Sequence, residues 1–286
     1  MADALDRICN RQSALCNAIS GSLAAIITLM PEPVAITRAV SSALAACELT
    51  YQQRVPIDVD VARAQHQAYE QALAAAGYRI ERLDTDSAMP DSVFVEDMAI
   101  VFDELAILTR PGADSRRREM PAIAAALAAY RPLREIQPPG TVDGGDVLVA
   151  GRRGFVGRST RTNDAAAAQI RSILRPVGYT VIETEVRGCL HLKSAVTVLD
   201  DDRLLVNPEW IDAATFDGFT LVNVAPEEPS AANALRLADR IVFPTAFPLT
   251  AVRLTALGLR LDLVDASELA KAEGAVTCCS LLVASR

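Results

Sequence analysis

The chain has 286 residues, of which 51% are hydrophobic and 22% are charged, and its formal net charge at pH 7 is −8. This composition supports a sizeable core and excludes a disordered or fibrous protein. The acidic balance argues against nucleic acid as a partner. No apolar run reaches the roughly 18 residues of a membrane span, so we expect no membrane partner.

Six cysteines are spread along the chain without a C-x-x-C pair. That pattern is unlike a disulfide-dense secreted protein, so we expect a cytoplasmic one. An apolar stretch at residues 22–29 is similar to the core of a signal peptide, but Asp3 and Asp6 stand where its positive flank belongs. We expect residues 1–32 to form an N-terminal extension, helical or disordered, ahead of a single domain over residues 33–286. As an apolar helix, this extension would favour a homodimer.

After the extension, one pattern recurs five times: an amphipathic helix followed by a short apolar strand. In the first helix, Ala62, Tyr69 and Leu73 lie seven and four positions apart, as on one face of a helix. The predicted helices are residues 59–77, 115–130, 163–176, a shorter one at 208–216, and 250–257. The predicted strands that follow them are residues 78–83, 133–136, 179–184, 219–224 and 259–264.

Hairpin-like segments separate these pairs at residues 94–109, 142–156, 195–206 and 232–243. A fifth hairpin forms only if the last predicted strand, residues 277–283, pairs with an early strand at residues 33–40. Five units of roughly 40–50 residues, closed by joining the two chain ends, form a ring without exposed sheet edges. We therefore expect a closed ring of repeats within one domain.

Polar residues recur at the starts of these hairpins, where a closed ring directs them toward its axis. Packing does not explain polar side chains placed repeatedly at the same end of buried strands, so the sequence predicts a central site. The residues are Asp91, Glu96 and Asp97 in the first unit, Asp143 and Asp146 in the second, His191 and Lys193 in the third, Glu227, Glu228 and Asn233 in the fourth, and Glu273 and Cys278 in the fifth.

A cysteine and a histidine far apart in the sequence are what a Cys/His nucleophilic enzyme requires, if the fold brings them together. Cys278 is the favoured nucleophile, although the alternative is a packing role in the core, where free cysteines usually lie. Because neighbours on a strand face opposite ways, either Cys278 or Cys279 faces the axis, and the sequence leaves open which. His191 is the candidate acid and base, whereas His66 lies in mid-helix and is expected to pack.

Asp143 lies in a Thr-Val-Asp-Gly-Gly-Asp segment that is typical of unusual backbone dihedrals, and it offers a carboxylate to orient His191. An ordinary Asx turn is the alternative. Asp91, Glu96 and Asp97 lie within seven residues on a predicted strand. Buried acids are costly unless a cation pairs with them, which favours a guanidinium or ammonium substrate.

Arg116 and Arg161 are candidates for a bidentate grip on a carboxylate, although the arginine run at residues 116–118 is also typical of a solvated surface. A metal is the rival explanation for the acids, but His191 and Asp143 lack a compact ligand spacing, so we expect no metal. The double-glycine segment lacks the G-x-G-x-x-G spacing of a dinucleotide site, so we expect no cofactor.

Together these segments resemble dimethylarginine dimethylaminohydrolases, members of the guanidine-modifying pentein superfamily. The matching stretches are residues 89–97, 108–113 with 115–117, 141–146, 161–163, 190–193, 231–233 and 274–280. They spread over about residues 36–283, in the order that the family has. The resemblance implies an α/β fold: a five-bladed, pseudo-symmetric α/β-propeller of ββαβ units, closed by the N- and C-terminal strands.

The resemblance also implies a role for each candidate residue. Cys278, the first of the cysteine pair, would form a catalytic trio with His191 and Asp143, without a metal or organic cofactor. The substrate-binding residues would hold three parts of an arginine-like molecule. Asp97 with Glu96 would hold the guanidinium, Arg116 and Arg161 the α-carboxylate, and Asp91 with main-chain carbonyls near Leu49 and Ala272, beside Glu273, the α-amino group.

The implied activity is hydrolysis of N-methylated arginine, from asymmetric dimethylarginine to citrulline and dimethylamine, through a covalent Cys thiouronium intermediate. One alternative is an arginine deiminase or related arginine hydrolase, which differs in the leaving group. Another is a non-catalytic pentein scaffold that only binds. Cys47 and Glu48 depart from residues common in the family's lid, where substrate preference varies. Zinc held by Cys278 and His191 is expected to inhibit.

Overall fold

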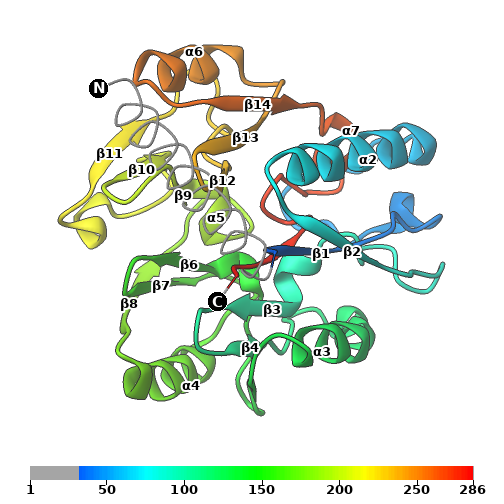
Figure 1. Ribbon diagram of the computed structural model, residues 1–286, viewed down its shortest axis with the longest axis vertical. Coiled ribbons are helices and arrows are strands. Elements are labelled where there is room, and N and C mark those ends of the chain that lie inside the picture. The colour runs from blue at the N-terminus through cyan, green and yellow to red at the C-terminus, as the bar shows by residue number, and fades with distance from the viewer. Residues whose placement is uncertain (1–31, 286) are drawn as a thin grey trace, which may run out of the picture.

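The structure is a computed structural model that describes residues 32–285. The extension expected over residues 1–32 lies outside this part of the chain, apart from Glu32. Within it, the strands form five three-stranded sheets arranged around a common centre (Figure 1). No helix of the described residues is both long and apolar enough to cross a membrane.

Short strands and helices alternate along the whole described chain. The strands are β1 (Val34–Arg38), β2 (Arg79–Leu83), β3 (Ala99–Val101), β4 (Ala106–Leu108), β5 (Leu133–Glu135), β6 (Val147–Ala150), β7 (Arg153–Arg158), β8 (Thr180–Glu185), β9 (Val196–Val198), β10 (Arg203–Val206), β11 (Thr220–Asn223), β12 (Leu235–Leu237), β13 (Arg240–Pro244), β14 (Leu261–Val264) and β15 (Leu281–Val283). The α-helices are α2 (Val59–Ala75), α3 (Met120–Ala128), α4 (Asp164–Leu174), α5 (Leu192–Ala195), α6 (Pro248–Ala256) and α7 (Ser267–Ala270).

Every sheet combines an antiparallel hairpin with a parallel third strand. β3 pairs antiparallel with β4, and β4 pairs parallel with β5 after a crossover through α3. The sheets β6-β7-β8, β9-β10-β11 and β12-β13-β14 repeat this order. The fifth sheet joins the two ends of the chain, since β15 pairs antiparallel with β1, with Val283 opposite Val34, and β1 pairs parallel with β2. The predicted closed ring of five units is confirmed, although the connection between β10 and β11 contains a 3₁₀ helix, η6 (Ala213–Phe216), in place of an α-helix.

The helix α2 shows how local sequence sets these elements. The Asp58 side chain accepts hydrogen bonds from the backbone N–H groups of Asp60 and Val61, which satisfies donors that a helix start leaves free. The helix ends before Gly77, whose φ of +91° favours glycine. Its predicted apolar face is buried, and His66 is buried with it, in the packing position expected.

The middle strand of each sheet lies between its two neighbours, and its apolar residues supply much of the core. In β10, for example, Leu204, Leu205 and Val206 are fully buried. A strand covered on both faces is continuously apolar rather than alternating. The hairpin starts are left facing the centre of the ring, where the polar residues meet.

Two predicted helices differ from the structure. Residues 115–130 divide into a 3₁₀ helix, η3 (Asp114–Glu119), and α3, because Pro121 falls in the first turn of α3, where its missing N–H is tolerated. The helix predicted at residues 208–216 is wrong, since that segment contains only the 3₁₀ helix η6 (Ala213–Phe216). The backbone there bonds to another segment instead: the carbonyl of Trp210 accepts the N–H of Arg187.

Two strands predicted next to the site are also wrong over part of their length. Residues 91–97 form turns and the 3₁₀ helix η2 (Val95–Met98), and the N–H of Phe94 bonds to the carbonyl of Asp91. The strand predicted at residues 277–283 begins only at Leu281, because the N–H of Cys278 bonds to the carbonyl of Ala275 in a turn. Both segments are largely buried, so they contain apolar residues although they are not strands, and this led to the wrong prediction.

Candidate active site

Residues from the hairpin starts line one small cavity between the blades. Its free volume is about 20 Å³, room for about one water molecule. Some of the predicted site residues do not line this cavity: Leu49, Glu96, Asp146, Lys193, Glu227, Glu228 and Asn233. The carboxylate of Glu228 instead accepts the N–H groups of Leu249 and Thr250. The lining residues are Glu48, Asp91, Phe94, Asp97, Arg116, Asp143, Arg161, Leu190, His191, Ala272, Glu273 and Cys278.

Asp143 and His191 form the contact expected of an orienting carboxylate and its histidine. His191 Nε2 lies 3.1 Å from Asp143 Oδ2, and both side chains are buried. The second oxygen of Asp143, Oδ1, accepts a hydrogen bond from the N–H of Gly112 at 2.8 Å. Because both oxygens are engaged, the carboxylate has one orientation, and it fixes the plane of the imidazole.

The two glycines after Asp143 are required by close packing. A β-carbon on Gly144 would collide with the carbonyl oxygen of Glu96, and one on Gly145 would lie 2.7 Å from His191 Nδ1. The N–H of Gly145 donates to Asp97 Oδ1 at 3.2 Å. Neither glycine is among those with a positive φ, so the unusual dihedrals expected of this segment are not what requires them. Because Gly144 and Gly145 have no side chains, the Glu96 backbone, the His191 imidazole and the Asp97 carboxylate can all approach this segment closely.

The charge state of His191 suits a general acid. Burial alone would lower the pKa of its imidazole, but the carboxylates of Asp97, Asp143 and Asp146 outweigh burial and raise that pKa to about 9. Burial likewise favours the neutral form of Asp143, but the hydrogen bond with His191 lowers the pKa of this carboxyl. His191 is therefore cationic at neutral pH and has a proton to give.

The two neighbouring cysteines face different surroundings. Cys278 lines the cavity, whereas Cys279 is buried in the apolar core with its Sγ 3.5 Å from the carbonyl oxygen of Ala275. Strand alternation left this choice open and the family resemblance implied Cys278, and it is Cys278 that the turn at residues 275–278 places at the cavity. Burial, together with the carboxylates of Glu96 and Asp97, raises the pKa of Cys278 well above its usual range. At rest this side chain is a thiol, not a thiolate.

The buried acids of the first unit are paired with cations of the protein itself. Asp97 Oδ2 lies 2.5 Å from Arg116 Nη1, and Glu96 Oε1 lies 2.7 Å from Lys193 Nζ. Arg116 also pairs with Glu119 at 2.9 Å and is buried, unlike an arginine of a solvated surface. Asp97 is thus already paired with a cation, and Glu96 is directed at Lys193 rather than into the cavity.

Two further candidates for substrate binding line the cavity but are bonded to residues 48–50. Arg161 Nη2 donates to Thr50 Oγ1 at 3.0 Å. The carboxylate of Asp91 accepts the N–H of Glu48, at 3.1 and 3.3 Å to its two oxygens. Burial raises the pKa of Asp91 to about 6. Leu49 packs against the apolar core beside them.

The fold also groups three side chains of the types that can bind a metal, although they are far apart in the sequence. One ligand atom each of Asp97, Asp143 and His191 lies within 4.8 Å of the others. The spacing in the sequence gave no sign of this group, because its members come together only in the fold. A cation here would compete with Arg116 for Asp97 and with the proton of His191. Zinc bound through Cys278 stays a prediction.

Two buried polar residues bond to the backbone next to the reactive side chains, and the sequence predicted no such role for them. Asp146 Oδ1 accepts the N–H of Leu192, next to His191, at 3.0 Å. Asn233 Oδ1 accepts the N–H of Thr277, next to the candidate nucleophile, at 3.1 Å. Both residues were noted as polar positions at hairpin starts, which was the available signal. These hydrogen bonds fix the position of the backbone that carries His191 and Cys278.

Comparisons with known proteins agree with this geometry. An N(G),N(G)-dimethylarginine dimethylaminohydrolase of Streptomyces coelicolor is 39% identical over 253 residues, which cover 88% of this chain and 97% of the relative. The Pseudomonas aeruginosa enzyme of the same name is 37% identical over 226 residues, or 78% of this chain and 89% of the relative. No family model matches the chain.

Two solved structures share the whole fold. The Pseudomonas aeruginosa dimethylarginine dimethylaminohydrolase, as a cysteine-to-serine variant complexed with citrulline, superposes with a TM-score of 0.83 at 34% identity, covering 87% of this chain and 98% of that one. A histidine-to-glycine variant of a dimethylarginine dimethylaminohydrolase, solved as an adduct with S-methyl-L-thiocitrulline, gives the same TM-score of 0.83 at 34% identity, again covering 87% of this chain and 98% of that one.

Proposed function

The chain belongs to the dimethylarginine dimethylaminohydrolase family, and we propose that it hydrolyses asymmetric dimethylarginine to citrulline and dimethylamine. The observation that carries this proposal is the convergence of Cys278, His191, Asp143 and Asp97 on one cavity. A thiol, a cationic imidazole with its orienting carboxylate, and a carboxylate that can pair with a guanidinium are the groups that this reaction requires.

Binding begins with an exchange of cations. The substrate guanidinium pairs with the carboxylate of Asp97 in place of Arg116. Arg116 is released from Asp97 and, together with Arg161, binds the α-carboxylate of the substrate. Asp91 takes the α-amino group, together with main-chain carbonyls of neighbouring residues. Each of these four side chains lines the cavity. The substrate is thereby held at both ends, with the guanidinium carbon at the thiol.

The bound cation makes Cys278 reactive. Its positive charge offsets the carboxylates that keep the thiol neutral, so the thiol proton is lost to solvent. The thiolate attacks the guanidinium carbon, and the C–N bond to dimethylamine breaks as His191 donates a proton to the leaving nitrogen. Asp143 stabilises the imidazolium before this transfer. An S-alkylthiouronium on Cys278 and a neutral His191 remain.

Hydrolysis of the intermediate restores the enzyme. His191 takes a proton from a water molecule, and the water oxygen attacks the carbon bonded to Cys278 Sγ. The C–S bond then breaks, the proton of the added hydroxyl passes to the departing thiolate, and citrulline leaves with Cys278 again a thiol and His191 again an imidazolium. The cycle consumes one water and needs no external oxidant or reductant.

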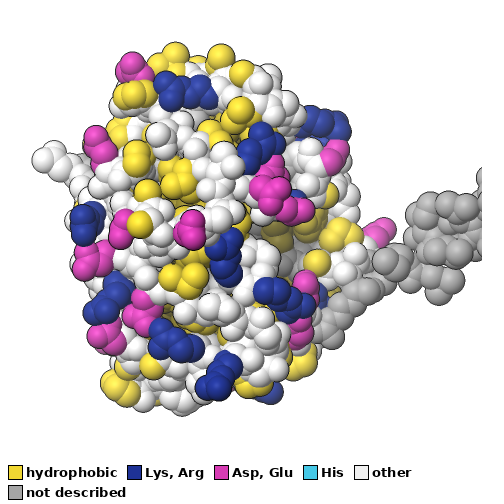
Figure 2. Space-filling model, turned by 90° about the vertical axis from the view of Figure 1, so that its left-hand side faces the viewer, with side chains coloured by type: hydrophobic (Ala, Val, Ile, Leu, Met, Phe, Trp, Pro, Cys, Tyr) yellow, Lys and Arg dark blue, Asp and Glu magenta, His cyan; other side chains and the backbone are white. Residues whose placement is uncertain are grey.

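We make three further proposals on the setting of this activity. The first is a cytoplasmic location: a catalytic thiol needs reducing surroundings, and the four cysteines among residues 32–285 are all free. Basic and acidic side chains are interspersed on the face shown in Figure 2, which supports a small cationic amino acid rather than nucleic acid as the partner. The third proposal is that residues 33–286 act as one catalytic domain, and a homodimer stays a prediction.

The test is citrulline release from asymmetric dimethylarginine, monomethylarginine and arginine, measured side by side with the Cys278→Ser variant as control. We expect release mainly from the methylated substrates and none from the variant. Citrulline mainly from arginine would keep the mechanism but favour an arginine hydrolase. No release from any of the three substrates would favour the non-catalytic scaffold.

A further inference from the structure

The segment between η1 (Leu44–Ala46) and α2 borders the central cavity through Glu48. We call residues 47–52 of this segment the cover. It contains no helix or strand, and its residues 50–52 are exposed. Glu48 lines the central cavity, while Tyr51 and Gln52 line a second cavity of about 300 Å³. Because so little of the cover is buried, its position depends on tethers to other segments.

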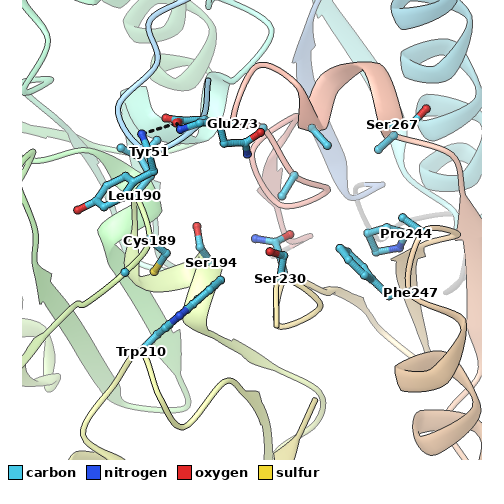
Figure 3. Close-up of a pocket in the computed structure, with 18 residues that line it drawn as sticks. Tyr51, Cys189, Leu190, Ser194, Trp210, Ser230, Pro244, Phe247, Ser267 and Glu273 are labelled. Atoms are coloured by element: carbon cyan, nitrogen blue, oxygen red, sulfur yellow. Dashed lines mark hydrogen bonds between the residues drawn. The ribbon is translucent and has the colours of Figure 1, made fainter. Parts of the chain in front are cut away.

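The strongest of these tethers is the carboxylate of Glu273, 221 positions beyond Gln52. Its Oε1 accepts the N–H groups of Tyr51 and Gln52, both at 2.6 Å, and that of Thr50 at 3.1 Å. Its Oε2 accepts the same Thr50 N–H at 3.0 Å. Three successive amides directed at one carboxylate form an anion-binding concavity, and hydrogen bonds to a charged acceptor are stronger than neutral ones. Figure 3 shows Glu273 and Tyr51 meeting at one edge of the second cavity.

The backbone under Glu273 is held in a conformation that L residues rarely adopt. Its φ is +59°, in the left-handed region, although it is not a glycine. The N–H groups of Glu273 and Gly274 bond to the carbonyls of Ala270 and Leu269, and a β-carbon on Gly274 would collide with the ring of Phe94. An anchored residue with strained dihedrals at the edge of a reactive cavity points to a function that compensates for the strain.

Two other tethers of the cover use side chains that the substrate needs, whereas Ser115 Oγ donates to Glu48 Oε1 and Arg54 donates to the Cys47 carbonyl at the opposite end of the cover. The Glu48 N–H bonds to Asp91, and Thr50 Oγ1 bonds to Arg161. In the proposed function, Asp91 takes the substrate α-amino group and Arg161 the α-carboxylate, so both tethers compete with the substrate. The carboxylate of Glu273 has no such competing partner. At residues 50–52 it is therefore the contact that persists when the substrate binds.

We propose that Glu273 is a positioning residue, whose carboxylate holds the cover over the bound substrate. This assigns Glu273 a role through the cover backbone rather than as a direct ligand of the substrate. The Leu49 carbonyl, which is expected to help bind the α-amino group, belongs to the peptide bond whose N–H, that of Thr50, bonds to Glu273. The same hydrogen bond therefore positions this carbonyl. The effect of Glu273 on substrate binding rests on the proposed function, whereas its effect on the position of residues 50–52 does not.

The test compares Glu273→Ala and Glu273→Gln with a matched control, Glu268→Ala. Glu268 lies on the same C-terminal segment and also accepts a backbone N–H, that of Asp58, but it lines neither cavity. Amide hydrogen exchange of the substrate-free protein is the first readout. We expect the amides of residues 50–52 to exchange about tenfold faster or more in Glu273→Ala. They should exchange at an intermediate rate in Glu273→Gln, whose amide oxygen still accepts, and at the wild-type rate in Glu268→Ala.

Steady-state kinetics on asymmetric dimethylarginine give the second readout. We expect KM to rise about tenfold in Glu273→Ala, with partial recovery in Glu273→Gln and kcat changed by less than about threefold. Unchanged exchange at residues 50–52 in Glu273→Ala would overturn the proposal, and so would a loss of kcat with constant KM. The exchange experiment needs no turnover, so an inactive wild-type protein would contradict the proposed function and leave the role of Glu273 in holding the cover to be decided by exchange.

Discussion

Gly145 lies so close to the imidazole of His191 that a β-carbon at position 145 would be 2.7 Å from Nδ1. The Gly145→Ala substitution must therefore displace the ring from Asp143. We expect kcat/KM to fall by about a hundredfold, since a shift of about 1 Å in a reactive group has that effect. Gly154→Ala is the control, because its β-carbon would meet Leu174 at an ordinary 3.8 Å. Equal activity of the two variants would contradict the tight fit.

The charge of His191 should be visible directly, because the chain has two histidines. Titration by nuclear magnetic resonance should give His191 a pKa of about 9 and His66, which burial favours in the neutral form, a pKa of about 4. The raised pKa of His191 contributes stability that is fully present below about pH 6.5 and is lost as the pH rises through about 9.

Asp143→Asn should lower the pKa of His191, because a carboxylate that favours the imidazolium becomes a neutral amide. We expect kcat to fall by about 10²- to 10⁴-fold, the usual contribution of a positioned acid and base. An unchanged pKa of His191 in this variant would show that Asp143 does not set its charge.

The neutrality of resting Cys278 predicts the pH dependence of its alkylation. In substrate-free protein its modification by iodoacetamide should be slow at neutral pH and should rise about tenfold per pH unit well into the alkaline range. Asp97→Asn should speed the modification, because it removes one carboxylate that raises the pKa of this thiol. Cys278→Ser gives the background from the other cysteines. Rapid modification of wild type at pH 7 would mean that the thiolate is already formed without substrate.

The paired charges around Arg116 predict a stability difference between two adjacent arginines. Arg116→Met leaves the buried carboxylates of Asp97 and Glu119 without their cation, and we expect a loss of about 3–5 kcal/mol in the free energy of unfolding. Arg117→Met breaks a pair with Asp114 whose side chains are 31% and 80% exposed, and should cost about 1 kcal/mol or less. Urea unfolding of both variants provides the comparison, and similar midpoints would contradict this account.

Local signals made most of the fold predictable. The spacing of Ala62, Tyr69 and Leu73 placed α2 within two residues of its observed end. The pairing of β1 with β15 followed from the need to close the ring and not from any motif. The helix expected at residues 208–216 failed because long-range backbone bonding, which no local pattern encodes, outweighs helix propensity there.

The candidate site was predictable in part for the same reason. Polar residues in apolar hairpins marked Asp97, Asp143, His191 and Cys278, and all four line one cavity. The counter-ions were not predictable, because Lys193 reaches Glu96 across 97 positions of sequence. The choice between the two cysteines depended on a turn whose hydrogen bonds are visible only in three dimensions.

The most direct test of the central claim is to trap the covalent intermediate. The protein is mixed with asymmetric dimethylarginine, quenched in acid during turnover, and measured intact and after digestion by mass spectrometry. The account predicts an increase equal to the substrate mass minus dimethylamine, located on Cys278 and missing in Cys278→Ser. An adduct on Cys279, or turnover that persists in Cys278→Ser, would contradict it.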